Sequence, residues 1–216
     1  MSTFRKKREY FDQQWTAEKV KEEVETGLAL LNSIHHKIVT IFGSARPAAE
    51  DQVYFHCENV AYTLGQKGYA LISGGGPGIM HAANSGAIRA KVPSIGMRAT
   101  LLTAERIHDP IFTHDLQFHF LFVRRFLMSI KSEALIFYPG GYGTLNELFE
   151  YAVLMQTGVV DTVPMICVDK EYWQGLLKWL EDSTLRQKFL DITDLHLLSF
   201  ADTAEEIIAQ IEGGKA

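Results

Sequence analysis

"ALIFYPGGYGTLNELFEYAVLMQTG", residues 134–158, joins an unbroken apolar run to a glycine-rich loop and then to a segment of helical periodicity. Such a run is typical of a strand that is buried on both faces, and the segment from Thr144 is expected to be a helix that ends near Gly158. Because a buried strand leads through glycines into a helix here, the stretch predicts part of a parallel α/β sheet.

The same alternation extends to both sides of this stretch. Further strands are expected at 37–43, 69–73, 93–97, 116–120 and 163–169, and further helices at 49–68, 77–90, 122–133, 171–182 and 203–211. This pattern predicts the α/β class, with a Rossmann-like doubly wound parallel sheet and helices on both faces, in one domain of residues 1–216. Residues 1–36, with a helix at 13–34, are expected to form a helical N-terminal extension.

Composition narrows the range of partners. The chain has 216 residues, 47% of them hydrophobic, and a net charge of −5, so no overall basic field attracts nucleic acid. No apolar run approaches the ~18 residues of a membrane span. Cys57 and Cys167 show no metal-ligand spacing and fit a reducing cytoplasm. We therefore expect a cytoplasmic protein with neither nucleic acid nor membrane as partner, and without a metal or cofactor.

Three of the predicted strands end in glycine. Gly43 and Ser44 follow the first, 74–78 the second, and 140–143 the strand of the opening stretch. The carboxyl ends of parallel strands share one edge of a sheet, and glycines at a helix start let an anion approach backbone N–H groups. The pattern predicts a phosphate site, although each glycine could instead only form a tight turn. Neither the GxGxxG fingerprint nor a P-loop is present.

Thr144 and Glu147 allow two interpretations. Thr-x-x-Glu before an apolar helix is a capping box, in which the glutamate bonds back to the N-cap amide. Alternatively, Glu147 lies beside the sugar of a bound ligand and stabilises an oxocarbenium-like ribose or activates water, with Glu150 near the same helical face. Arg124 and Arg125 precede this motif, and only one of them can face the site because adjacent helical residues point about 100° apart.

In order and spacing, "FGSARP" (42–47), "SGGGPGIMHAAN" (73–84), "RRFLM" (124–128) and "PGGYGTLNELFE" (139–150) resemble the LONELY GUY family, long labelled possible lysine decarboxylases. The resemblance covers roughly residues 37–180, and "QTG" with "YW" at 172–173 is similar to the longer branch of the family. It implies a phosphoribohydrolase that releases free base and ribose 5-phosphate from a nucleoside 5′-monophosphate, namely a cytokinin riboside monophosphate or AMP. It also implies a homodimer or a higher homo-oligomer.

The resemblance also implies roles for individual residues. Glu147 and Arg124 would be catalytic, and Arg125 and Met128 fill the remaining positions of the arginine motif. The phosphate and ribose would be held, beside Ser44, by Gly74, Gly75, Gly76, Gly140, Gly141, Gly143 and Thr144.

The chain departs from the family pattern at several positions. His81 replaces a usual glutamate, Asn146 replaces an acidic residue, and the 99–116 loop matches poorly, with Glu105 as its candidate acidic residue. A histidine on such a helix is more often a packing or surface residue than a catalyst. The old decarboxylase label does not fit, because the motif loops lack the lysine that pyridoxal phosphate requires.

Two other functions remain open at this point. The chain could be a non-catalytic carrier or sensor of a nucleotide or a molybdopterin-type cofactor. It could also be an assembly protein whose glycine loops are only turns. The presence of both Arg124 and Glu147 favours the enzyme, since a carrier needs the glycines but not that pair.

Overall fold

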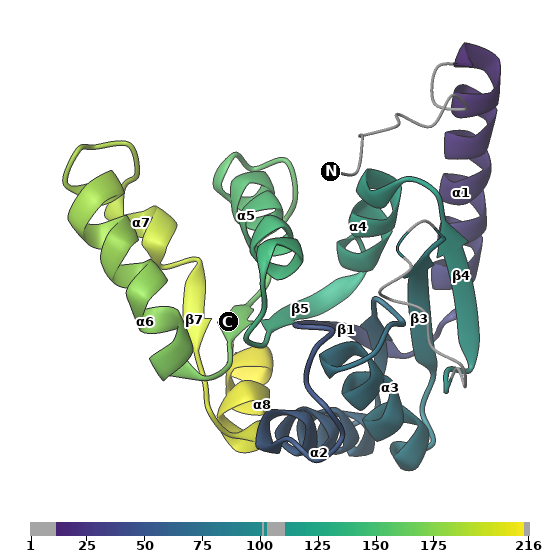
Figure 1. The fold of residues 1–216 in the computed structure, drawn as a ribbon, viewed down its shortest axis with the longest axis horizontal. Helices are drawn as coiled ribbons and strands as arrows, with labels where there is room; N and C mark the ends of the chain where they lie inside the picture. Colours follow the sequence, from purple (N-terminus) through teal and green to yellow (C-terminus); the bar gives the residue numbers. More distant parts are fainter. Residues whose placement is uncertain (1–11, 101, 103–110, 214–216) are drawn as a thin grey trace, which may run out of the picture.

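The computed structural model describes residues 12–100, 102 and 111–213 (Figure 1). Within these ranges, seven strands form one sheet in the order β4-β3-β2-β1-β5-β6-β7, and every neighbouring pair is parallel. The strands are β1 Lys37–Phe42, β2 Tyr69–Ser73, β3 Ser94–Ala99, β4 His114–Phe118, β5 Ser132–Phe137, β6 Met165–Cys167 and β7 Leu198–Phe200. The predicted doubly wound parallel sheet is confirmed.

Helices cover both faces of this sheet, as Figure 1 shows. Val39 and Ile41 of β1 pack in a core shared with α2, α3 and α8, whereas Ile38 and Phe42 pack in a second core shared with α1, α4, α5 and α6. This division follows from the alternation of side chains along a strand. The helices are α1 Gln13–Ser33, α2 Gln52–Gln66, α3 Ile79–Ala90, α4 Leu121–Ser129, α5 Tyr142–Gln156, α6 Lys170–Trp179, α7 Ile192–Leu195 and α8 Ala204–Gly213, with a π-helical segment at Leu180–Leu185.

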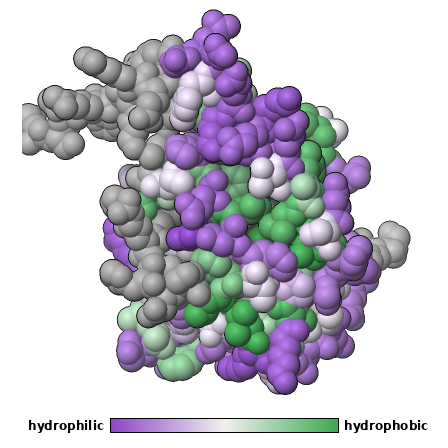
Figure 2. Space-filling view, turned by 90° about the vertical axis from the view of Figure 1, so that its right-hand side faces the viewer, coloured by the Kyte–Doolittle hydropathy of each residue, from purple (hydrophilic) through white to green (hydrophobic). Residues whose placement is uncertain are grey.

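Helix α1, predicted as an extension, packs against α4 and belongs to the second helix layer. Its residue Leu31 is fully buried in that core. The buried carboxylate of Glu23 accepts hydrogen bonds from the backbone N–H groups of His119 (2.7 Å) and Phe120 (3.4 Å), directly before α4. Hydrophilic side chains cover the protruding end of α1 in Figure 2. α1 therefore has one face in the core and one toward solvent, and it helps to fix the start of α4.

Several boundaries differ from the sequence prediction. Helix α4 ends at Ser129 rather than at 133, because β5 already begins at Ser132. The structure also contains β7 and α7, which were not predicted, since both are too short to give a periodic signal. Gly68 and Gly158 have φ of +87° and +68°, which confirms the helix ends expected near them. No helix in the described part of the chain combines the length and apolarity needed to cross a bilayer.

Candidate active site at the edge of the sheet

The candidate site lies where the strand order reverses. From β1 the chain builds the sheet outward through β2, β3 and β4, and it then returns to place β5 on the other side of β1. The loops after β1 and β5 touch, since the Ser44 N–H donates to the Pro139 carbonyl at 3.0 Å. Ligands of doubly wound sheets bind in the crevice at this kind of switch point.

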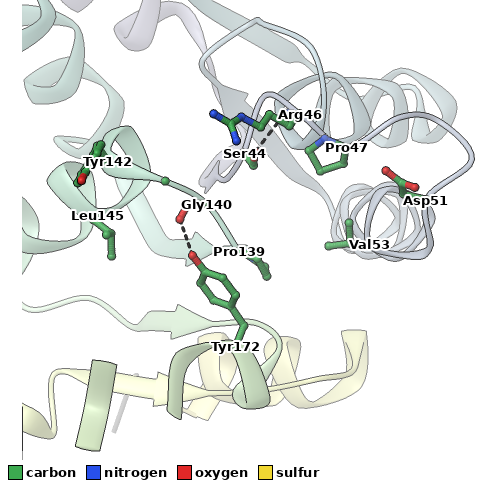
Figure 3. Close-up of a pocket in the computed structure, with 11 residues that line it drawn as sticks. Ser44, Arg46, Pro47, Asp51, Val53, Pro139, Gly140, Tyr142, Leu145 and Tyr172 are labelled. Atoms are coloured by element: carbon green, nitrogen blue, oxygen red, sulfur yellow. Dashed lines mark hydrogen bonds between the residues drawn. The ribbon is translucent and has the colours of Figure 1, made fainter. Parts of the chain in front are cut away.

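Two pockets open at this crevice. The inner pocket has a volume of about 220 Å³ and is lined by Gly43, Ser44, Ala45, Arg46, Met80, Arg124, Gly141, Gly143, Thr144 and Glu147. The outer pocket has a volume of about 720 Å³ and is lined by Ser44, Arg46, Pro47, Asp51, Val53, Pro139, Gly140, Gly141, Tyr142, Leu145 and Tyr172 (Figure 3). Because Ser44, Arg46 and Gly141 line both, the two pockets adjoin at the start of α5.

Helix α5 begins earlier than predicted. Its N-cap is Gly141 and its first residue is Tyr142, and the Leu145 N–H donates to the Gly141 carbonyl at 3.0 Å. Thr144 is thus the third residue of the helix and not its N-cap, so the capping-box interpretation of Thr144 and Glu147 is wrong. The first N–H groups of a helix have no intrahelical acceptor, and those of α5 begin at Gly141, a residue shared by both pockets.

Thr144 places a buried hydroxyl on the wall of the inner pocket. The residue is 4% exposed, and its hydroxyl makes no hydrogen bond to any residue in the described ranges. A Cβ at Gly140 would lie 2.1 Å from the Thr144 Oγ1, so only glycine leaves room for this side chain. A buried hydroxyl without a protein partner on a pocket wall is suited to a polar ligand.

Arg124 is held in the inner pocket by two carbonyl groups from other parts of the sheet edge. It is 4% exposed, and its guanidinium donates from Nε to the Met97 carbonyl at 2.7 Å and from Nη2 to the Gly74 carbonyl at 3.3 Å. A Cβ at Gly74 would lie 2.1 Å from Nη2. Gly74 therefore contributes to the site by giving Arg124 both an acceptor and space.

Gly75 and Gly76 of the β2 loop were expected to hold the phosphate and ribose, but they lie away from both pockets. Gly75 and Gly76 are buried and line neither pocket. Gly75 has φ +64° and packs on β3, where an added Cβ would lie 3.1 Å from the Gly96 Cα. The two glycine loops do not share one pocket wall. The loop after β5 lines the pockets, and the loop after β2 supports Arg124.

Arg125 and Met128 also lie outside the two pockets. Met128 is fully buried in the core shared with α1, α4, α5 and α6. The Arg125 Nε donates to Glu150, and the Tyr151 hydroxyl donates to the Arg125 carbonyl at 2.8 Å. Burial raises the pKa of the Tyr151 phenol, and the nearby Glu147 and Glu150 carboxylates raise this pKa further, so Tyr151 stays a donor. These residues join α4 to α5 and thereby fix Arg124 relative to Glu147.

His81 is a packing residue of α3. Its Nδ1 lies 2.5 Å from the Tyr54 hydroxyl of α2, and burial lowers the pKa of the imidazole. It lines neither pocket. Glu105, the candidate acidic residue of the 99–116 loop, lies outside the described residues.

Arg46 and Tyr172 lie within quoted motifs, but the sequence analysis assigned neither of them a role in the site. Arg46 is exposed, lines both pockets and has no ion-pair partner among the described residues. Tyr172 lines the outer pocket, and its hydroxyl donates to the Gly140 carbonyl at 2.5 Å (Figure 3). Arg46 follows the Gly43-Ser44 strand end, which could have indicated it. The hydrogen bond of Tyr172 joins residues 32 positions apart, so no nearby sequence pattern indicates it.

Fold and site together define a Rossmann-like α/β protein with a pocket at the switch point of its sheet, lined by the start of α5 and by Arg124. The family model described as "Possible lysine decarboxylase" matches residues 80–211. The chain belongs to this family, which is the LONELY GUY family suggested by the sequence motifs.

Two of the named relatives are plant proteins. A protein of Oryza sativa subsp. japonica named probable cytokinin riboside 5′-monophosphate phosphoribohydrolase is 28% identical over 88% of this chain and 76% of its own length. A protein of the same name from Arabidopsis thaliana is 37% identical, over 41% of this chain and 44% of its own length. The second match thus spans less than half of the relative.

Solved structures support the fold. The molybdenum cofactor binding protein from Rippkaea orientalis matches 85% of this chain and 100% of its own with a TM-score of 0.60 at 19% identity. The Moco carrier protein from Chlamydomonas reinhardtii matches 83% of this chain and 97% of its own with a TM-score of 0.58, also at 19% identity. At these identities the likeness concerns the fold alone.

The reaction named in the description "lysine decarboxylase" needs a side chain that the described pocket walls lack. A decarboxylase of that type holds pyridoxal phosphate on a Schiff-base lysine. Among the residues that the structure describes, no lysine lines either pocket.

Proposed function

We propose that the protein is a phosphoribohydrolase that hydrolyses the N-glycosidic bond of a purine nucleoside 5′-monophosphate, a cytokinin riboside monophosphate or AMP, to free base and ribose 5-phosphate. One observation carries the proposal: Thr144, Glu147 and Arg124 line a single pocket at the start of α5. The names of the plant relatives support the same reaction class.

The 5′-phosphate is assigned to the start of α5. Backbone N–H groups from Gly141 onward and the positive end of the helix dipole favour an anion at this position. The Thr144 hydroxyl supplies a further donor, and Arg46 supplies a cation at the junction of the two pockets. Ser44 lines the opposite wall, from the loop after β1.

The ribose then lies over Glu147, which stands one helical turn beyond Thr144. As the bond to the base breaks, positive charge develops on the ribosyl ring, and a carboxylate beside it stabilises this charge or takes a proton from the attacking water. Arg124, held by the Met97 and Gly74 carbonyls, holds the substrate in register or assists departure of the base. This scheme requires neither a metal nor a cofactor.

Glu147→Gln tests the assignment because it removes the charge and keeps the shape. We expect release of base from AMP and from isopentenyladenosine monophosphate to fall by at least about 100-fold, with the melting temperature nearly unchanged. Glu25→Gln is the control, since this side chain on α1 is 66% exposed and lines neither pocket. Full turnover in Glu147→Gln would refute the catalytic role, and equal turnover of adenosine and AMP would refute the phosphate assignment.

A carrier of a nucleotide or a molybdopterin-type cofactor is the alternative. It predicts that the wild-type protein binds its ligand at the start of α5 and releases no base from any nucleotide. Binding without turnover in the same assay would therefore favour the carrier.

We also propose that the protein is a homodimer or larger homo-oligomer through a patch on α4 and α5. The α4–α5 patch consists of large apolar side chains that are 37–54% exposed, namely Leu121, Phe122, Phe126, Ile130, Phe149 and Val153. A group of exposed apolar side chains on adjoining helices is typical of a protein interface. Since the same two helices carry Arg124 and Glu147, such an interface would lie beside the catalytic pair.

A further inference from the structure

Tyr172 makes a contact that links α6 to the glycine loop of the site. Its hydroxyl donates to the Gly140 carbonyl at 2.5 Å, and its ring forms a wall of the outer pocket (Figure 3). The residue is 46% exposed, and exposure of a single aromatic side chain is common on protein surfaces. Its hydrogen-bond acceptor, the Gly140 carbonyl, belongs to the residue directly before the N-cap of α5, so the contact reaches the start of that helix.

The orientation of one peptide group follows from this contact. The Gly140 carbonyl and the Gly141 N–H belong to the same peptide unit, and the described chain has no cis peptide bonds. In a trans peptide the carbonyl and the N–H point in opposite directions. A carbonyl drawn to Tyr172 on the outer-pocket side therefore turns the Gly141 N–H away from Tyr172. The inner pocket, which Gly141 also lines, adjoins the outer pocket at this residue.

The two residues that flank this peptide unit restrict its orientation only weakly. Both flanking residues are glycines, which have the widest choice of backbone conformations, so rotation of the peptide between them meets little steric resistance. Gly141 is exposed, and an added Cβ there would meet nothing within 4 Å. A hydrogen bond from outside the loop is thus an effective way to select one orientation.

Tyr172 is itself fixed by the contacts that hold the start of α6. The Asp169 side chain caps the helix by accepting from the Tyr172 N–H at 3.2 Å. The Asp202 carboxylate accepts from the N–H groups of Asp169 and Lys170 at 3.0 and 3.1 Å. Trp173 is buried, and its indole N–H donates to the Val168 carbonyl at 2.9 Å. The phenol therefore extends from an anchored helix start toward the loop.

We infer that Tyr172 is a positioning residue that sets the Gly140–Gly141 peptide so that the Gly141 N–H is available to the phosphate of the substrate. The inference deepens the proposed function and rests on its placement of the 5′-phosphate at the start of α5. Tyr172 acts through the backbone and needs no contact with the reacting atoms.

Tyr172→Phe removes the hydroxyl and keeps the ring that lines the outer pocket. We expect the KM for AMP to rise about fivefold to tenfold, with kcat changed less than twofold, because only the hydrogen bond that orients the phosphate-binding peptide is lost. Tyr62→Phe, on α2 and outside both pockets, controls for the loss of a tyrosine hydroxyl. A merely structural role would lower the melting temperature and would not raise KM selectively.

A second measurement needs no turnover. With the wild-type protein labelled at glycine with ¹³C and ¹⁵N, we expect inorganic phosphate to shift the Gly141 amide signal. In Tyr172→Phe the half-saturating phosphate concentration should rise about fivefold to tenfold, and the Gly140 carbonyl signal should move even without phosphate. An unchanged Gly140 signal together with an unchanged phosphate titration would overturn the inference. If the wild-type protein binds phosphate at Gly141 but hydrolyses no nucleotide, the proposed function fails and the role of Tyr172 is still decided.

Discussion

At the scale of single residues, the site depends on side chains that approach the backbone closely. Arg124 reaches the Gly74 carbonyl because no Cβ stands in its way, and Thr144 occupies the space that a side chain at Gly140 would fill. The glycines around the site therefore have separate tasks. Gly74 leaves space for the Arg124 guanidinium, Gly140 leaves space for the Thr144 hydroxyl, and Gly141 is the N-cap of α5.

Gly74→Ala tests the first of these tasks. The added Cβ would lie 2.1 Å from the Arg124 Nη2 and 2.5 Å from the Met80 Sδ, both at the ends of flexible side chains. We expect the protein to fold with a loss of less than about 1 kcal/mol, whereas kcat for AMP falls about 10- to 100-fold because the guanidinium is displaced. Thermal unfolding and steady-state kinetics measure the two effects.

Gly175→Ala is the matched control for this change, since nothing lies within 4 Å of a Cβ at that position on α6. If Gly74→Ala has the kcat of the wild-type protein, the position of the Arg124 guanidinium seen here is not required for hydrolysis of AMP.

The sequence motifs contained the residues that line the inner pocket but not the contacts that hold them. Glu147, Thr144 and Arg124 lie within recognisable motifs, and the structure brings all three to one pocket. Tyr172 bonds to a residue 32 positions away, and no local spacing encodes such a contact. The capping box was a wrong alternative because α5 starts at Tyr142, and the glycines before Thr144 hide that start from a periodicity argument.

At the scale of helices and strands, α4 is held at its beginning by α1. The N-cap of α4 is Phe120, which has no side-chain cap hydrogen bond, and the backbone N–H groups of His119 and Phe120 donate to the buried Glu23 carboxylate instead. A carboxylate at a helix N-terminus also interacts favourably with the helix dipole. Because α4 carries Arg124, the orientation of this helix matters for the site.

Glu23→Gln removes the charge and leaves one oxygen acceptor. We expect the free energy of unfolding to fall by about 1–2 kcal/mol, since two backbone donors lose a charged acceptor in a buried position. Urea unfolding measures the change. Glu22→Gln is the control: this side chain is 64% exposed and pairs with Lys19, so its loss should cost less than about 0.5 kcal/mol. Equal stabilities of the two variants would contradict this role of Glu23.

Sequence patterns predicted the long elements better than the short ones. β1, β2 and β5 are apolar runs with almost every residue buried, which is the pattern that a central parallel strand requires. β7 has three residues of intermediate burial, and α7 has four residues, so neither gives a periodic signal. The order of the strands was not predictable either, because it depends on pairings between distant segments.

At the scale of the whole molecule, the α4–α5 patch predicts self-association. Phe122→Asp places a charge on a side chain that is 54% exposed, so the fold should be retained while an interface through this patch is disrupted. We expect light scattering to give an oligomer for the wild-type protein and a monomer for Phe122→Asp, with similar melting temperatures at high dilution.

Phe189→Asp is the control for self-association, since Phe189 is 74% exposed and belongs to neither α4 nor α5. A wild-type monomer would refute the proposed oligomer. A Phe122→Asp oligomer of wild-type size would place the interface elsewhere.

The pairing of β1 with β5 also has a consequence for biosynthesis. Ile38 is aligned with Ser132, so one edge of β1 obtains its neighbour only after more than half of the chain has been made. An unpaired strand edge readily joins a strand of another molecule. Until the ribosome has translated β5, the nascent chain thus exposes an unpaired edge of β1, the strand that later lies at the centre of the sheet. Slow synthesis of this segment would favour aggregation, and chaperone binding to the emerging polypeptide would counteract it.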